Sequence, residues 1–171
     1  MDEPRFWAMI ESAWAAAGGL ARERAALLAG ELDPDDDERL TAALDDAVVP
    51  ALRQALEQLP ADDLLAFDRI LERTLHALDR ADIHEHTDGS DDGFLYARGF
   101  IVAAGQAYCE AVLADPSRAV PDLEAEALCY LPWHLHRDQF GDIPPSGLSR
   151  ETGSNRAGWP DAAAATELED D

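Results

Sequence analysis

Apolar residues recur at every third or fourth position through most of the chain, and this periodicity constrains the fold more than any other feature. The clearest run has steps of four, four, four, four and three: Leu40, Leu44, Val48, Leu52, Leu56 and Leu59. Such spacing places the side chains on one face of an α-helix. No segment alternates apolar and polar residues for long enough to predict a strand. We therefore predict an all-α fold, a single-domain irregular bundle of five to seven helices.

Capping residues and prolines predict where these helices begin and bend. Asp33 before Pro34 is a typical N-cap pair, and Ser90 is expected to cap a later helix that runs to about residue 114. Pro50 lies inside the leucine run and predicts a kink or break near Val49. Residues 81–89 are expected to form a loop, and the last helix is expected to run from about residue 121 to 131. Gly99 and Gly105, inside a predicted helix, are expected where another helix approaches closely.

The composition changes at Gly141, after which Gly, Pro and Ser are frequent. We predict a helical domain over residues 1–140, and over residues 141–171 a mostly irregular C-terminal segment with an acidic tail. Trp133 and Trp159 lie in less regular chain, so each is expected either to cover the core or to line a groove.

The chain is strongly acidic, with 36 acidic residues against 13 basic ones and a net charge of −23. This field repels nucleic acids and anionic membranes, and we expect neither as a partner. No apolar run is long enough to span a bilayer. The N-terminus lacks the pattern of a signal peptide, and two cysteines make no disulfide framework. We therefore expect a cytoplasmic protein with reduced thiols.

Two segments resemble a bacterial family known only as a domain of unknown function. One is the Phe6-Trp7 start, and the other combines paired acids, an arginine, an aromatic-Ile-Val step, a glycine and an Asp-Pro: Asp91, Asp92, Phe94, Arg98, Phe100, Ile101, Val102, Gly105, Asp115 and Pro116. The resemblance spans about the first 120 residues. This chain has Phe100 where the family usually has Trp. The resemblance implies a small, mainly helical protein and brings no activity with it.

Two His-x-His pairs are the candidate metal ligands: His84 with His86, and His134 with His136. In an extended segment, residues two apart point the same way and can bind one metal ion, whereas on a helix they diverge. Together the pairs could close a four-ligand zinc site, which would make the protein a metal-binding protein or a metal-dependent hydrolase. The alternative interpretation is that the histidines lie in exposed loops and that the protein has no cofactor.

Arg98 is the candidate ligand-binding residue. Its spacing from Phe94 and Ile101 places it on or beside the buried face of its helix. A buried guanidinium needs carboxylates or carbonyls as partners. One interpretation is an internal salt bridge to Glu11 or Asp68, and the other is a clamp on a small anionic ligand.

These features favour a non-enzymatic binding or regulatory module whose partner is an unknown protein or a small anionic ligand. The alternatives are the zinc-dependent functions of the histidine pairs and an acidic decoy for a basic partner. The sequence identifies no catalytic residue.

Overall fold

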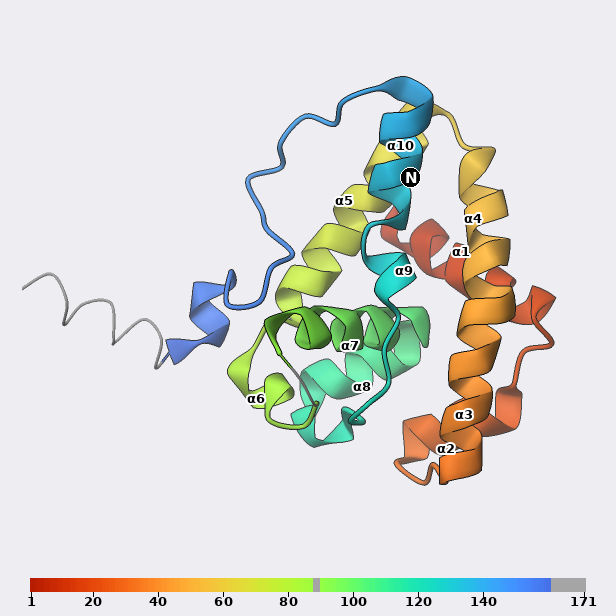
Figure 1. The fold of residues 1–171 in the computed structure, drawn as a ribbon, viewed down its shortest axis with the longest axis vertical. Coiled ribbons are helices and arrows are strands. Elements are labelled where there is room, and N and C mark those ends of the chain that lie inside the picture. The colour runs from red at the N-terminus through yellow and green to blue at the C-terminus, as the bar shows by residue number, and fades with distance from the viewer. Residues whose placement is uncertain (88–89, 161–171) are drawn as a thin grey trace, which may run out of the picture.

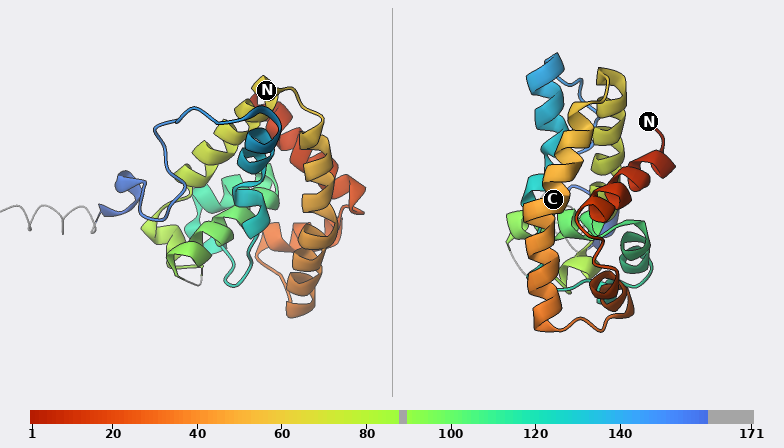
Figure 2. Two further views of the ribbon diagram at one scale, coloured as in Figure 1. Left: turned by 45° about the horizontal axis from the view of Figure 1, so that its top comes forward. Right: turned by 90° about the vertical axis from the view of Figure 1, so that its right-hand side faces the viewer.

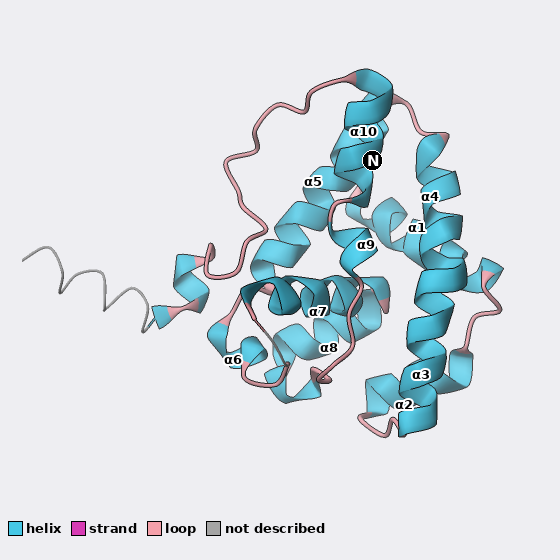
Figure 3. Ribbon diagram, in the orientation of Figure 1, coloured by secondary structure: helices cyan, strands magenta, loops and turns pink. Residues whose placement is uncertain are grey.

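A computed structural model of the chain describes residues 1–87 and 90–160. Within these residues the fold is helical and contains no strand, so the all-α, single-domain prediction is confirmed (Figures 1 and 3). The elements are α1 (Glu3–Ala16), α2 (Ala21–Ala29), α3 (Pro34–Ala43), η1 (Leu44–Val48), α4 (Val49–Glu57), α5 (Ala61–Ala77), α6 (Ala81–His84), α7 (Asp91–Ala103), α8 (Gln106–Ala114), η2 (Pro116–Arg118), α9 (Glu126–Cys129), α10 (Leu131–Phe140) and η3 (Arg156–Gly158).

The predicted range of five to seven helices holds for the longer elements. The segments α3, η1 and α4 form one continuous helix along one side of the molecule (Figures 1 and 2). Counted in this way, the described part of the chain has nine helices, of which α6 and α9 are single turns of four residues. None of its helices is long and apolar enough to cross a membrane.

The predicted caps at the helix starts are present. The side chain of Asp33 accepts a hydrogen bond from the Asp36 backbone N–H at 2.9 Å, and Ser90 accepts one from Gly93 at 3.3 Å. Each cap provides a partner for an N–H group that lacks one inside its helix. Local sequence therefore determines where α3 and α7 begin.

Pro50 changes the helix that contains it without ending it. Proline lacks an N–H, and its ring clashes with the carbonyl four residues earlier. The chain widens into the π-helical turn η1 just before Pro50, and the N–H of Val49 bonds to the Leu44 carbonyl five residues back. The predicted distortion near Val49 is thus a π turn inside a continuous helix.

The predicted helix from Ser90 to about residue 114 is two helices, so this prediction was wrong. Gly105 separates α7 from α8 with φ of +110° and ψ of 169°, a conformation open mainly to glycine. Gly99, by contrast, is helical as predicted, and a Cβ there would lie 2.6 Å from the Cys129 sulfur of α9. The close helix approach expected at Gly99 is therefore confirmed.

Two local predictions near the histidines were also wrong. Residues 81–84 form α6 within the segment predicted to be a loop. No helix begins at Pro121; α9 begins at Glu126, and α10 continues from Leu131 to Phe140. Pro132 lies in the first turn of α10, where proline is tolerated because no intrahelical N–H is needed there.

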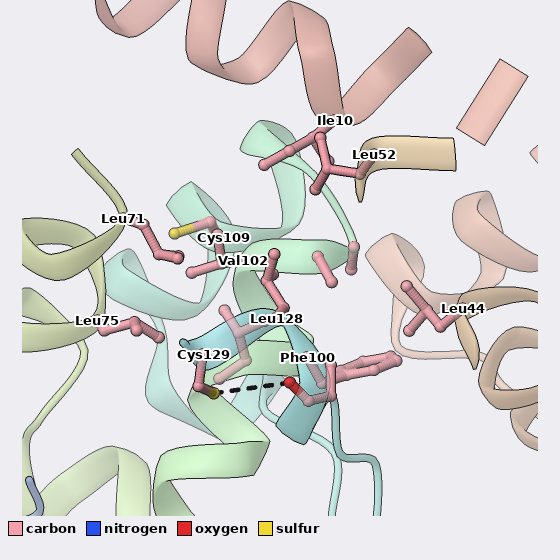
Figure 4. Close-up of a cluster of buried hydrophobic side chains, with 14 of the residues drawn as sticks. Ile10, Leu44, Leu52, Leu71, Leu75, Phe100, Val102, Cys109, Leu128 and Cys129 are labelled. Carbon is pink, nitrogen blue, oxygen red and sulfur yellow. Dashed lines mark hydrogen bonds between the residues drawn. The ribbon is translucent and has the colours of Figure 1, made fainter. Parts of the chain in front are cut away.

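The core lies where α7 meets α5, α8 and α9, and where α1 packs against η1 and α4. A cluster of buried apolar side chains forms most of it, and Figure 4 shows part of this cluster: Ile10, Leu44, Leu52, Leu71, Leu75, Phe100, Val102, Cys109, Leu128 and Cys129. After α10 the chain leaves the body as an irregular segment and returns beside α5, α6 and α7 (Figure 1). This return positions the polar groups described next.

Candidate functional site

Arg98 lies on α7 in the interior of the molecule and has no exposed surface. Its Nη1 donates to the Leu75 carbonyl at 2.9 Å, and its Nη2 donates to the Arg150 carbonyl at 2.9 Å. Its Nε lies 3.4 Å from the carbonyl of Phe94, whose ring is stacked 4.8 Å from the guanidinium. Every nitrogen of the side chain is therefore engaged within the protein.

Arg98 does not form the predicted salt bridge with Glu11 or Asp68, so this prediction was wrong. Glu11 pairs instead with Arg24 at 2.6 Å, and Asp68 pairs with Arg150 at 2.5 Å. No carboxylate among the described residues lies within ion-pair distance of Arg98. Carbonyl oxygens compensate this buried charge. They are one of the two kinds of partner that a buried guanidinium was expected to need, the other being a carboxylate. Burial lowers the pKa of the Arg98 guanidinium, and the charge of Asp79 acts in the opposite direction.

Two of the partner groups of Arg98 come from residues 148–159, which we call the C-terminal strap. Besides the Arg150 carbonyl, the Thr152 hydroxyl accepts from Arg98 Nη2 at 3.2 Å. Arg150 itself is 5% exposed and inserts into the body. Its guanidinium donates to Asp68 and to the Cys129 carbonyl, both at 2.5 Å. The strap thus contributes a buried positive charge to the interior.

Asp79, just after the end of α5, holds residues 153–159 of the C-terminal strap. This carboxylate has no exposed surface. It accepts four hydrogen bonds from the strap: from the Asn155 N–H at 2.8 Å, the Gly153 N–H at 3.0 Å, the Ser154 hydroxyl at 3.2 Å and the Trp159 indole at 2.9 Å. Trp159 therefore covers the core, one of the two roles predicted for it.

These hydrogen bonds determine the ionisation of Asp79. Burial alone would raise its pKa. The N–H groups of Asn155, Gly153 and Trp159 and the charge of Arg98 outweigh burial and hold the pKa of Asp79 below its ordinary value of 3.8. Asp79 is therefore a carboxylate at neutral pH, and its negative charge holds the strap.

The C-terminal strap occupies the position that a ligand of Arg98 would need. Because the guanidinium has no exposed surface and its nitrogens already have partners, Arg98 does not face a ligand in this conformation. In this conformation the groups that Arg98 Nη2 binds belong to the protein's own strap, and the hypothesis of a clamp on an anionic ligand stays a prediction.

The two histidines of the first pair lie in different environments. His84 ends α6 and is half-buried, with its ring 4.8 Å from Phe94 and 5.5 Å from Trp159. His86 is exposed. His84 is thus an aromatic packing residue beneath the C-terminal strap.

The second pair lies on α10, where residues two apart point in different directions. His136 is 6% exposed, and its Nδ1 lies 3.2 Å from the Gly141 carbonyl. His134 is exposed and lies beside Trp133, with ring centroids 5.0 Å apart. Within residues 1–87 and 90–160, no group of three or more His, Cys, Asp or Glu side chains is placed to hold a metal ion. The zinc hypothesis stays a prediction, and the described residues add no ligand set to it.

A groove of about 390 Å³ lies between α5, α10 and residues 143–151. Its walls include Tyr130 and Trp133, both half-buried, and the exposed Leu148. Glu72 and Arg150, both more than nine-tenths buried, also line it. We call this cavity the aromatic groove. Trp133 therefore lines a groove, the second of the two roles predicted for these tryptophans.

Arginines surround the aromatic rings of this groove. Arg150 stacks 5.4 Å from Tyr130, and Arg137 stacks 4.4 Å from Trp133. Arg69 donates to Glu72 at 3.1 Å and also to the Pro144 carbonyl, which ties the irregular wall to α5. The groove thus combines aromatic surface with charges that are already paired.

A second hollow of about 310 Å³ also has Tyr130 in its lining. It is lined by Arg53 of α4, Tyr96 of α7 and His134 of α10, among others. Tyr130 lines both cavities. The surface formed by α10 therefore offers two adjoining depressions with aromatic, histidine and arginine side chains.

Comparison with known proteins identifies the family. A family model described as "Protein of unknown function (DUF4240)" matches residues 36–138, more than half of the chain. The chain belongs to the DUF4240 family. No match was found among curated proteins or among solved structures. The predicted membership of a family of unknown function is thus confirmed.

The DUF4240 match contains one side of the strap interaction. Asp68, Asp79 and Arg98 lie within residues 36–138, whereas the strap residues that they bind lie beyond its end. The two aromatic residues Tyr130 and Trp133 lie inside the match. The match ends close to the end of α10, so the irregular wall of the aromatic groove lies outside it.

Sequence reasoning missed Asp79 and Arg150, the two charged anchors of this DUF4240 chain. Asp79 directly follows Leu78 at the end of a regular apolar stripe, where an acid is usually exposed to solvent. Arg150 lies in a Ser- and Gly-rich segment with no periodicity. The net charge was the one signal in the sequence that pointed to such residues. In so acidic a chain, any buried acid needs one of the few arginines as a partner.

Proposed function

We propose that this DUF4240 protein is a non-enzymatic binding module of the bacterial cytoplasm that holds a peptide segment of a partner protein in the aromatic groove. The observation that carries the proposal is a large exposed apolar side chain in the wall of the groove, flanked by half-buried aromatic rings. Of the three large apolar residues that are exposed in the described chain, Leu148 lines the groove. Half-buried Tyr130 and Trp133 line it as well.

The composition of the groove favours protein recognition. Tyr, Trp and Arg are enriched among the residues that dominate binding energy at protein interfaces. Here Tyr130 and Trp133 are held by stacked arginines, so little side-chain entropy is lost when a partner binds. An irregular backbone wall at residues 143–149 can exchange hydrogen bonds with an extended peptide.

Binding explains the groove better than catalysis does. Arg69 and Glu72 neutralise each other at 3.1 Å. Neither thiol of the chain lines the groove, and burial raises the pKa of both, Cys109 and Cys129, to about 12, so neither is a thiolate nucleophile at neutral pH. The net charge of −23 disfavours nucleic acids and anionic membranes as partners and supports a protein partner.

A peptide library displayed on phage and selected on the full-length protein tests this function. We expect selected peptides to share an apolar or aromatic residue, and Trp133→Ala to weaken their binding by at least tenfold, because truncated tryptophans at such sites cost about 2 kcal/mol or more. Fluorescence polarisation with a labelled selected peptide measures the change.

Leu148→Ser and Leu28→Ser form a matched pair for the same measurement. The two leucines are 39% and 40% exposed, but only Leu148 lines the aromatic groove, whereas Leu28 lies on α2. Only Leu148→Ser should weaken peptide binding. Selection without a shared sequence, or peptides that bind Trp133→Ala as tightly as the wild type, would contradict the proposal.

A further inference from the structure

The lining of the aromatic groove contains an acceptor and a donor that lie close together without bonding to each other. Glu72 of α5 and Arg150 of the C-terminal strap both line the groove and are both more than nine-tenths buried. The Glu72 Oε1 atom and the Arg150 Nε atom lie 3.9 Å apart. This gap is wider than the roughly 2.7–3.2 Å of an N–H···O hydrogen bond.

The remaining polar atoms of the two side chains are bonded within the protein. Glu72 Oε2 accepts from Arg69 at 3.1 Å, and Arg150 Nη1 and Nη2 donate to the Cys129 carbonyl and to Asp68. These bonds compensate the charges and fix the positions of both groups. Within the described part of the chain, only Glu72 Oε1 and Arg150 Nε of these two side chains have no hydrogen-bond partner.

Solvent reaches these two atoms. The unpartnered side-chain oxygens and nitrogens that solvent cannot reach belong, among the described residues, to Trp7, Arg24, Asp37 and Asp68. Glu72 Oε1 and Arg150 Nε also lack partners but are not in that set, so each has accessible surface. Because the aromatic groove is the cavity that both residues line, a molecule in the groove can contact both atoms.

Such a pair suits a ligand group that donates and accepts side by side. A primary carboxamide is uncharged and has an NH2 donor and a carbonyl acceptor on one carbon. A carboxylate would be repelled by Glu72, and an ammonium group would be repelled by Arg150. A main-chain peptide group contains the same atoms, but in its trans form the N–H and the C=O point in opposite directions.

We infer that the aromatic groove recognises a primary carboxamide, whose NH2 donates to Glu72 Oε1 and whose oxygen accepts from Arg150 Nε. The source of this group rests on the proposed function: an Asn or Gln side chain of the bound peptide supplies it. A neighbouring apolar side chain of the peptide packs on Trp133 and Leu148, which line the same groove. Since α5 supplies the acceptor and the strap supplies the donor, the site is complete only when the strap is docked.

A small probe tests the carboxamide site without a peptide. Butyramide should shift the Arg150 Nε–H resonance of the full-length, nitrogen-15-labelled protein in a saturable way at pH 7. Butyrate has the same shape but a charge, and N-methylbutyramide is a trans secondary amide like the main chain. Each should bind at least tenfold more weakly, because a buried polar pair rejects a group that cannot satisfy both of its members. No shift with butyramide, or equal binding of either analogue, would overturn the inference.

Two variants test the contact with Glu72. Glu72→Gln removes the repulsion of a carboxylate and adds a donor, so the preference for butyramide over butyrate should fall at least tenfold. Glu151→Gln is the matched control, because Glu151 also lines the groove but its Oε1 is bonded to the Tyr130 hydroxyl at 2.8 Å. This control should keep the wild-type preference. An unchanged preference in Glu72→Gln, or an equal loss in both variants, would disprove the assigned contact.

Peptides from the phage selection test the source of the carboxamide. Peptides whose binding is weakened by Trp133→Ala should share an Asn or Gln, and replacing that residue with Glu should weaken binding at least tenfold. Groove-binding peptides that tolerate the replacement would contradict the inference and leave the proposed function standing. A selection without a shared sequence would instead contradict the proposed function. The butyramide titration would then still decide whether the groove binds a carboxamide, with a small molecule as its source.

Discussion

At the scale of single residues, the interior of this protein contains charged side chains that are removed from water. Asp68, Asp79 and Arg98 have no exposed surface, and Arg150 is 5% exposed. An ion taken out of water is costly unless hydrogen bonds replace its hydration. Each of these groups obtains that replacement from a segment distant in sequence, so each acts as a tether between α5 or α7 and the C-terminal strap.

Substitution of Arg98 tests this tether directly. Arg98→Met keeps a long apolar side chain but leaves the carbonyls of Leu75 and Arg150 without their donor. We expect the free energy of unfolding to fall by about 2–6 kcal/mol, because two buried carbonyls lose their donor and each such loss costs about 1–3 kcal/mol. Urea denaturation measures the change, and Arg53→Met, at an exposed position on α4, should change stability by less than about 0.5 kcal/mol. A stable Arg98→Met protein would mean that the strap is held by other contacts.

The depressed pKa of Asp79 predicts a pH dependence with a definite sign. The carboxylate binds its proton more weakly in the folded state than in the unfolded chain, so its contribution to stability is full above about pH 4. That contribution is lost as the pH falls through the folded-state pKa. The stability difference between wild type and Asp79→Asn should therefore be about 2–3 kcal/mol at pH 7 and should shrink below pH 4. Urea titrations at several pH values measure it, with Asp35→Asn, an exposed acid on α3, as the control.

The two thiols give a residue-scale measure of local opening. Cys109 and Cys129 are about 1% and 0% exposed, and burial raises the pKa of each to about 12. At pH 8 a disulfide reagent such as DTNB should therefore react with neither thiol on the timescale of seconds in the native protein, but with both in urea. Rapid reaction of one thiol before unfolding would show that the helix over it opens independently.

At the scale of elements, glycine geometry decides how α7 is joined to α8. Gly105 adopts a conformation that costs other residues about 1–3 kcal/mol, and a Cβ there would lie 2.4 Å from a Glu11 carboxylate oxygen and 2.7 Å from Arg24. Gly105→Ala should therefore lower the free energy of unfolding by about 2–4 kcal/mol. Gly30→Ala, with φ of +74° but open space around the new methyl group, should cost about 1–2 kcal/mol. Equal losses in urea denaturation would mean that the Glu11–Arg24 pair moves aside freely.

Elements defined by local signals were predictable, and elements defined by distant contacts were not. The caps of α3 and α7 and the distortion near Pro50 follow from residues within one or two turns. The helix α10 lies beyond the end predicted for the last helix, and Pro132 in its first turn does not prevent a helix. His134 and His136 were therefore predicted to lie in a loop, whereas in the structure they lie on a helix and point in different directions.

At the scale of the whole molecule, the contacts of the site could not be predicted from local sequence, because they join segments that are far apart in the chain. The periodicity indicated that Arg98 is buried and needs partners, but nothing local indicated that its partners are the carbonyls of Leu75 and Arg150. The boundary predicted at residue 140 follows a real change in composition. Residues beyond it nevertheless satisfy three of the buried charges of the helical body: Asp68, Asp79 and Arg98.

The helical body should therefore depend on the strap for its stability. A chain that ends at Phe140 removes the hydrogen-bond donors of Asp68 and Asp79 and an acceptor of Arg98, together with the segment that covers them. Because hydrogen bonds to charged groups contribute about 1.5–3 kcal/mol each and domains of this size have only about 5–15 kcal/mol in total, we expect the shortened chain to be largely unfolded at 25 °C. Far-ultraviolet circular dichroism should show reduced helicity, and a synthetic peptide of residues 148–160 added in excess should restore part of it. A shortened chain that melts as cooperatively and at the same temperature as the full chain would show that residues 1–140 fold alone and that the strap is only an attachment to their surface.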